Sequence, residues 1–138
     1  MIYLDASAAV SQFVVDANTA EARAFIRRPG LSFGVSDLCV AEFTAAIAQH
    51  VRAQRYNADV ARALISAFET WSAASADPLA LLPTDVSATI SVLRRFDIRL
   101  RTPDALHLTI CQRVGAQLLS FDKDQIAAAL ELGIPLAQ

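Results

Sequence analysis

The chain has 138 residues, enough for one folded domain with its own core and too few for two domains. Of these residues, 54% are hydrophobic and 19% are charged, which excludes a disordered chain and indicates helices with large apolar faces. The formal net charge of −2 excludes a general basic surface, so any contact with nucleic acid must come from local arginines.

Two cysteines, Cys39 and Cys111, are too isolated to form a zinc site or a disulfide framework, and we expect buried free thiols. No signal peptide is predicted, because no basic segment precedes the first apolar run and Asp5 interrupts that run. No apolar stretch has the length needed to span a bilayer. The sequence therefore predicts a cytoplasmic protein without membrane contact.

The first predicted element is a buried strand at residues 2–4, followed by a short helix at residues 6–15 with Ser7 in its first turn. Asp5 lies at the junction, where a carboxylate must be paired, hydrated or metal-bound. Taken alone, an aspartate at this place is more often the N-cap of the helix than a catalytic group.

Helices and strands are predicted to alternate along the rest of the chain. The predicted helix N-caps are Asn18, Ser36, Asn57, Thr84 and Thr102. In chain order, we expect a helix at 18–28, a strand at 31–35, helices at 37–54 and 57–71, a strand at 79–82, a helix at 84–96, a helix from 102, a strand at 116–120, a helix at 123–132 and a short strand at 134–136. This alternation predicts a single α/β domain over residues 1–138, with a parallel sheet of four to five strands.

Glu42 is the least ordinary charge in the sequence. Its helical neighbours three and four positions away are Leu38, Cys39, Ala45 and Ala46, which place the carboxylate on an apolar face. A buried carboxylate without a partner is costly, so Glu42 is either a buried salt-bridge partner or a functional group.

Two further features have alternative interpretations. Val60, Leu64, Ile65 and Phe68 form an apolar helical stripe that is either core or a dimer contact. The one basic cluster is either a solvated face or a phosphate-binding patch, and it consists of Arg94, Arg95, Arg99 and Arg101.

Asp104 follows Thr102 and Pro103 at a predicted helix start, where an acid is favourable to the helix dipole. His107 and Cys111 follow on the same helix at four-residue spacing. This spacing suggests a Cys–His nucleophile pair, which we disfavour because no third orienting group is evident.

Asp122 repeats the geometry of Asp5 at the end of a later strand. The ligand site of an open parallel sheet lies outside the carboxyl ends of its strands, so Asp5 and Asp122 are expected there, with Asp104 and Glu42 near the same rim. Such carboxylates repel one another unless a cation lies between them, and their hard oxygens select Mg²⁺ or Mn²⁺. The cluster predicts phosphodiester hydrolysis by a metal-activated water, without a covalent intermediate.

The ordered motifs Asp5-Ala6-Ser7, Glu42, Pro103 to Leu108 and Leu118 to Asp122 resemble a PIN-domain protein, specifically a VapC-type toxin ribonuclease. The resemblance covers essentially the whole chain and implies a three-layer α/β/α fold. It also implies a Mg²⁺- or Mn²⁺-dependent endoribonuclease that is silenced by a small antitoxin and commonly forms homodimers. The implied catalytic and metal-binding acids are Asp5, Glu42, Asp104 and Asp122, with Ser7, Ser120 and Asp124 as supporting or further candidate residues.

Two other functions remain open from the sequence. One is a regulatory binding module, in which an acidic groove without chemistry binds an arginine-bearing peptide. The other is a small-molecule phosphohydrolase that resembles the haloacid dehalogenases, although Ser7 occupies the position of that family's second aspartate.

Overall fold

β1 (Ile2–Leu4) is the central strand of the computed structural model, which describes residues 1–137. It pairs with β2 (Phe33–Ser36) on one side and with β4 (Gln117–Leu119) on the other, while β3 (Ala76–Leu79) pairs with β2. All pairings are parallel, in the order β3-β2-β1-β4. The carboxyl ends of these strands therefore lie at one edge of the sheet. Gln138, the last residue of the predicted domain, lies outside the described residues.

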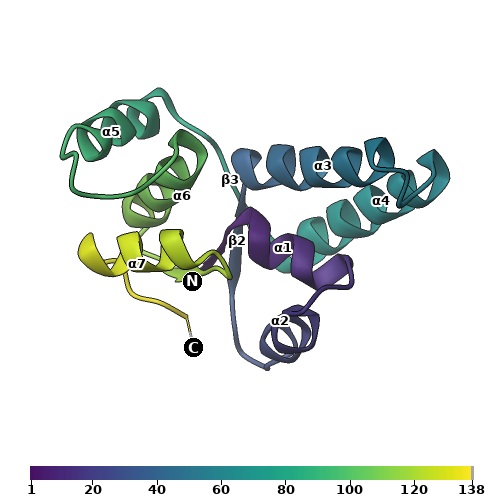
Figure 1. Cartoon of the computed structure of the whole chain (residues 1–138). Coiled ribbons are helices and arrows are strands. Elements are labelled where there is room, and N and C mark those ends of the chain that lie inside the picture. Colours follow the sequence, from purple (N-terminus) through teal and green to yellow (C-terminus); the bar gives the residue numbers. More distant parts are fainter. Residues whose placement is uncertain (138) are drawn as a thin grey trace.

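Helices cover both faces of the sheet (Figure 1). One layer contains α1 (Ala6–Phe13), α2 (Thr19–Ile26), α3 (Asp37–Arg52) and α4 (Ala58–Ser75). The other layer contains α5 (Pro83–Leu93), α6 (Thr102–Arg113) and α7 (Lys123–Glu131). The predicted three-layer α/β/α architecture is confirmed. Within residues 1–137, every helix is too short or too polar to cross a bilayer.

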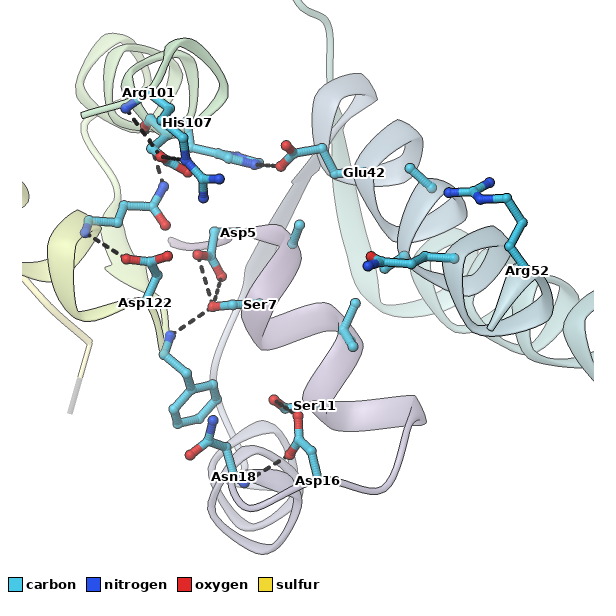
Figure 2. Close-up of a pocket in the computed structure, with 18 residues that line it drawn as sticks. Asp5, Ser7, Ser11, Asp16, Asn18, Glu42, Arg52, Arg101, His107 and Asp122 are labelled. Carbon is cyan, nitrogen blue, oxygen red and sulfur yellow. Dashed lines mark hydrogen bonds and ion pairs between the residues drawn. The ribbon is translucent and has the colours of Figure 1, made fainter. Parts of the chain in front are cut away.

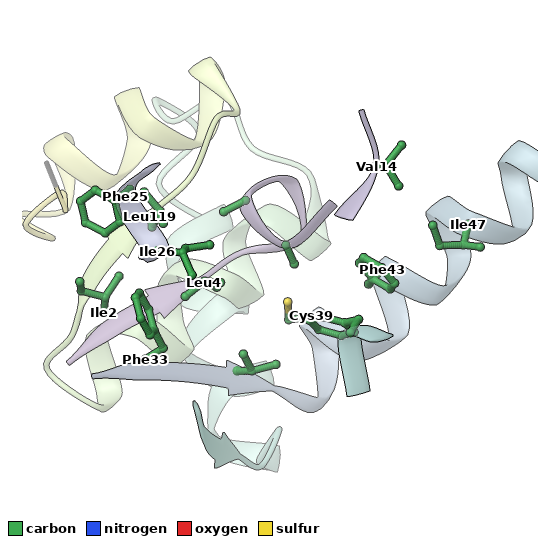
Figure 3. Packing of buried hydrophobic residues seen from close by; sticks show 14 of the residues in the cluster. Ile2, Leu4, Val14, Phe25, Ile26, Phe33, Cys39, Phe43, Ile47 and Leu119 are labelled. Carbon is green, nitrogen blue, oxygen red and sulfur yellow. The ribbon is translucent and has the colours of Figure 1, made fainter. Parts of the chain in front are cut away.

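Successive residues of β1 point into two separate cores, because side chains alternate between the faces of a strand. Ile2 and Leu4 belong to the core under α1–α4, together with Phe33 and Phe43 (Figure 3). Tyr3 belongs to the core under α6 and α7 and is completely buried there. The alternation thus directs the Tyr3 hydroxyl toward α6, where it contacts His107.

The two cysteines are buried and most of the apolar stripe on α4 packs in the larger core, as expected for structural residues. Both cysteines are buried free thiols, as predicted. Within the apolar stripe of α4, Phe68 is buried and Leu64 and Ile65 pack against the larger core, whereas Val60 is exposed. Three of the four stripe residues therefore belong to the core.

Capping residues explain where most helices begin. The side chain of Ser36 accepts a hydrogen bond from the backbone N–H of Cys39 at 3.1 Å, and Asn57 caps α4 in the same way. The predicted cap at Thr84 is wrong: α5 begins at Pro83, and Asp85 accepts a hydrogen bond from the backbone N–H of Leu82. An acid at the third helical position supplies the cap that a polar side chain before the helix would otherwise supply.

The same arrangement moves the N-cap of α6 from Thr102 to Arg101, whereas Asn18 occupies the predicted N-cap position of α2. Arg101 precedes α6, and its backbone N–H donates to Asp104, so Thr102 is the first helical residue rather than the cap. Asn18 makes no side-chain capping bond.

The third strand lies at Ala76–Leu79 rather than at residues 79–82, because α4 continues to Ser75 and passes directly into the strand. Pro78 is tolerated within it because β3 is an edge strand that pairs only with β2. The predicted terminal strand at 134–136 is reduced to a single bridge between Leu118 and Leu136.

Candidate active site

A pocket of about 590 Å³ lies beyond the carboxyl ends of β1 and β4. The chain passes from β1 to β2 and β3 on one side of the sheet, whereas β4 lies on the other side, so β1 and β4 flank the topological switch point. The pocket is lined by all four predicted acids, of which Figure 2 labels Asp5, Glu42 and Asp122. Its polar lining comprises Asp5, Ser7, Ser11, Asp16, Asn18, Glu42, Gln49, Arg52, Arg101, Asp104, His107, Asp122 and Gln125.

Asp5 is at once the N-cap of α1 and an acid of the pocket. Its side chain is 2% exposed and accepts a hydrogen bond from the backbone N–H of Ala8 at 2.8 Å. Burial raises the pKa of Asp5, while hydrogen bonds from Ser120, Ala8 and Ser7 act in the opposite direction. The structural and functional interpretations of Asp5 are therefore compatible, since one carboxylate caps the helix and faces the pocket.

Ser7 and Ser120 hold the carboxylate of Asp5 from two different segments. The Ser7 hydroxyl lies 2.8 and 2.9 Å from the two Asp5 oxygens, and Ser120 Oγ lies 2.6 Å from Oδ2. Ser7 Oγ also accepts a hydrogen bond from the backbone N–H of Phe121. These contacts tie the loop after β4 to the first turn of α1 and leave Asp5 little rotational freedom.

Asp122 is the N-cap of α7 and accepts a hydrogen bond from the backbone N–H of Gln125 at 3.0 Å. Like Asp5, it faces the pocket. Asp124 does not line the pocket, and its carboxylate lies 4.0 Å from Nε of Arg99. Gln125 was missed by the sequence analysis: its side chain is 2% exposed and contacts Ser120.

Asp104 also combines a structural contact with a place in the pocket. Its Oδ2 atom accepts hydrogen bonds from the backbone N–H and from Nε of Arg101, both at 3.3 Å. The guanidinium of Arg101 lines the same pocket and offsets part of its negative charge. The other arginine of the pocket, Arg52, reaches it from the end of α3 (Figure 2).

Glu42 is half-buried, with 32% of its side chain exposed, and its partner is His107. Glu42 Oε2 lies 2.7 Å from Nε2 of His107, and Nδ1 of the same ring lies 2.7 Å from the hydroxyl of Tyr3. Tyr3 in turn lies 2.7 Å from Ser36 Oγ. The apolar surroundings of Glu42 had indicated that it needs a partner, but the partner itself is 65 residues away in the chain.

With a neutral His107, the direction of each hydrogen bond in this chain follows from counting donors. An ionised Glu42 only accepts, so Nε2 of a neutral His107 carries the proton and Nδ1 must accept from the hydroxyl of Tyr3. Burial raises the pKa of Tyr3 well above its usual value and keeps that hydroxyl protonated. Tyr3 accepts from Ser36, which accepts from the backbone N–H of Cys39. The hydrogen bonds therefore run in one direction from the start of α3, through β1 and α6, back to Glu42 on α3.

The hypothesis of a Cys–His nucleophile pair is wrong. Both ring nitrogens of His107 are occupied by Tyr3 and Glu42, and Sγ of Cys111 donates to the backbone carbonyl of Ala116. Burial raises the pKa of the Cys111 thiol to about 12, so the thiolate that such chemistry needs is absent at neutral pH.

The far end of the pocket contains Asp16, which the sequence analysis did not single out. Burial acts to raise its pKa, but hydrogen bonds from Ser11, Asn18 and Thr19 outweigh this and lower it, so Asp16 stays ionised. Five carboxylates and two arginines line the pocket. This negative excess and these hard oxygen donors match the preferences of Mg²⁺ or Mn²⁺.

The acids do not form a ready-made metal cage. Within residues 1–137, no group of three or more histidine, cysteine or acidic side chains is arranged to hold one ion. Glu42 and Asp104 are turned toward His107 and Arg101, whereas Asp5 and Asp122 are fixed by their capping contacts. The donor set thus suits a divalent ion in its chemistry.

A model of the PIN domain family matches residues 2–131, and the chain therefore belongs to this family. A search of curated protein sequences found no match.

Solved structures agree with the family assignment. VapC20 from Mycobacterium tuberculosis, described as a Sarcin-Ricin loop cleaving toxin, has a TM-score of 0.74 and 18% identity, covering 93% of this chain and 95% of its own. VapBC2 from Rickettsia felis, solved with a DNA fragment from its promoter, has a TM-score of 0.70 and 12% identity, covering 99% and 98%. FitAcB from Neisseria gonorrhoeae has a TM-score of 0.66 and 13% identity, covering 100% and 97%. At these identities the likeness establishes the fold.

Proposed function

We propose that this chain is a metal-dependent endoribonuclease and the toxin of a toxin–antitoxin pair. The observation that carries the proposal is that Asp5, Glu42, Asp104 and Asp122 line one pocket at the switch point of the sheet. Membership of the PIN family and the likeness in fold to VapC20, described as a Sarcin-Ricin loop cleaving toxin, support it.

The same four acids would hold Mg²⁺ or Mn²⁺. When bound, such an ion neutralises the scissile phosphate and lowers the pKa of an attacking water. Within the chain, Ser7 and Ser120 orient the carboxylate of Asp5, and His107 orients that of Glu42.

The two pocket arginines have a separate role in this proposal. Arg52 and Arg101 supply positive charge at the rim of the pocket, where phosphates of the substrate would lie.

The proposal includes a small antitoxin, a homodimer and a cytoplasmic site of action. The likeness in fold to VapBC2, which is described as bound to a DNA fragment from its promoter, supports the antitoxin partner in this proposal. For the homodimer, α5 and the residue before it offer Leu82, Val86 and Ile90, which are four residues apart and between 37% and 46% exposed. Three large apolar side chains on one exposed helix face are typical of a protein contact.

Cleavage of RNA by the purified chain tests the nuclease. We expect cleavage in Mn²⁺ or Mg²⁺, none in EDTA, and none by Asp5→Asn, because the buried carboxylate is replaced by a neutral amide of the same shape. Asp59→Asn is the matched control, since Asp59 makes only an exposed ion pair on α4. Cleavage that survives EDTA, or that Asp5→Asn retains, would refute the proposal.

A binding module without chemistry is the second candidate. The observation that favours it is that each of the four acids already has a hydrogen-bond partner within the chain. Mn²⁺ binding separates the two functions: a nuclease site should bind Mn²⁺ in electron paramagnetic resonance titrations and lose this binding in Asp5→Asn. Tight binding of an arginine-bearing peptide without Mn²⁺ binding would favour the module.

A further inference from the structure

The loop between α5 and α6 concentrates positive charge in a chain whose net charge is negative. Residues 94–101 contain four arginines and one aspartate, Asp97, whereas the whole chain has a net charge of −2. Arg95 pairs with Asp97 within the loop. Arg94 and Arg99 are exposed, so most of this charge faces solvent.

Phe96, in the middle of this loop, is unfavourable for the fold in two ways. Its side chain is 91% exposed, more than any other large apolar residue in the described part of the chain. Its backbone has a φ of 61°, a left-handed conformation that bulky side chains rarely adopt. At Gly30, Gly115 and Gly133 the chain uses glycine for similar turns. A strained, exposed aromatic residue where glycine would serve the fold better indicates a function for the ring.

The loop continues directly into the active-site pocket. Arg101 lines the pocket and contacts Asp104, and Arg99 lies 4.0 Å from Asp124 in the first turn of α7. Figure 1 shows the loop joining α5 to α6 on the side of the molecule that also holds α7. Phe96 is five residues before Arg101, so the two Cα atoms are at most about 18 Å apart. A strand of RNA in the pocket would reach Phe96 within a few nucleotides.

We propose that residues 94–101 bind single-stranded RNA next to the cleaved bond, with Phe96 stacking on an unpaired base and Arg94 and Arg99 contacting phosphates. The inference rests on the proposed function and adds a substrate-binding surface and a strand preference to it. An exposed aromatic ring among arginines is the usual combination for single strands, because only an unpaired base offers its face. Phenylalanine and arginine are also enriched at protein interfaces, so a protein partner is the competing occupant that the experiment must distinguish from RNA.

Binding of a labelled 12-nucleotide single-stranded RNA in EDTA tests the inference without cleavage. Phe96→Gly should weaken binding about 5- to 150-fold, the usual effect of losing one stacked base, and Phe96→Trp should restore it. Because glycine suits a φ of 61°, Phe96→Gly should unfold no more easily than the wild type, so lost affinity cannot come from lost structure. Leu130→Ala, at a 61% exposed apolar residue on α7, is the control and should leave affinity unchanged.

Arg94→Gln supplies an independent measurement. It should lower the slope of log affinity against log salt by about 0.7, the contribution of one phosphate contact on a single strand. Duplex RNA of the same sequence should bind more weakly and be insensitive to Phe96→Gly. Unchanged affinity in Phe96→Gly, or an equal loss on duplex, would overturn the inference.

The outcomes separate this inference from the nuclease proposal. RNA that binds through Phe96 but is never cleaved in Mn²⁺ would refute the nuclease and leave the binding surface. Cleavage with an unchanged KM in Phe96→Gly would leave the nuclease and refute the surface. Phe96→Gly could instead dissociate an oligomer, seen as a lower molar mass in light scattering, and leave RNA affinity unchanged. In that case Phe96 belongs to a protein interface and the inference is wrong.

Discussion

Replacing Tyr3 by phenylalanine tests the hydrogen-bonded chain that ends at Glu42. The substitution removes one hydroxyl from a fully buried ring and opens almost no cavity. That hydroxyl lies 2.7 Å from both Ser36 Oγ and His107 Nδ1. Without it, the imidazole and the serine each lose a hydrogen-bond partner. Each buried polar group left unpaired costs about 1–3 kcal/mol, so the free energy of unfolding should fall by about 2–6 kcal/mol.

Urea denaturation measures this loss, and Tyr56→Phe is the control. Tyr56 is half-buried at the edge of a core, and its hydroxyl makes no hydrogen bond within residues 1–137, so its loss should cost less than about 0.5 kcal/mol. If both substitutions cost the same, the hydrogen-bonded chain contributes nothing to stability and our reasoning is wrong.

The same variant should affect Glu42, although Tyr3 does not touch it. Mutation of the direct hydrogen-bond partner of a metal ligand typically changes metal affinity 10- to 100-fold. Tyr3 is one step further away, behind His107, so we expect the lower end, about 10-fold weaker Mn²⁺ binding in Tyr3→Phe. In Glu42→Gln, adding Tyr3→Phe should change Mn²⁺ affinity no further, because its effect passes through Glu42. An equal effect of Tyr3→Phe in both backgrounds would show that Tyr3 acts on the site in another way.

Three other measurements follow from buried charges and thiols. Arg113 lies 2.6 Å from the carboxylate of Asp85, which is 1% exposed, so Arg113→Gln should cost about 3–5 kcal/mol in urea unfolding, whereas Arg62→Gln at an exposed pair should cost less than about 1 kcal/mol. Because the folded pKa of Asp5 is raised, its ionisation disfavours the fold as pH rises through the folded value, and this cost is absent below the unfolded value. In EDTA, Asp5→Asn should therefore melt above the wild type at pH 7 and near it at pH 3; a gap independent of pH would contradict this. Burial raises the pKa of Cys111 to about 12, so a thiol reagent at pH 8 should label this residue only after unfolding, and rapid labelling of the native protein would show that the site is open.

Strand ends and helix caps were predictable because they depend on near neighbours. The apolar run before Asp5 and the one before Asp122 each predict a strand that delivers a carboxylate, and parallel strands deliver their ends to one edge. Ser36 and Asn57 begin helices through bonds to residues three positions later. The sequence thus determined by itself the α/β fold, the family and the four acids that line the pocket.

The tertiary structure alone decided which side chains meet those acids. The four-residue spacing suggests only Cys111 as a neighbour of His107, a pair that we disfavour, whereas the observed partners are Glu42 and Tyr3, at separations of 65 and 104 residues. The starts of β3 and α5 also differed, because an edge strand accepts Pro78 and Asp85 folds back to cap its own helix. Contacts across such separations depend on how helices pack on the two faces of the sheet, and local pattern in the sequence carries no information about that packing.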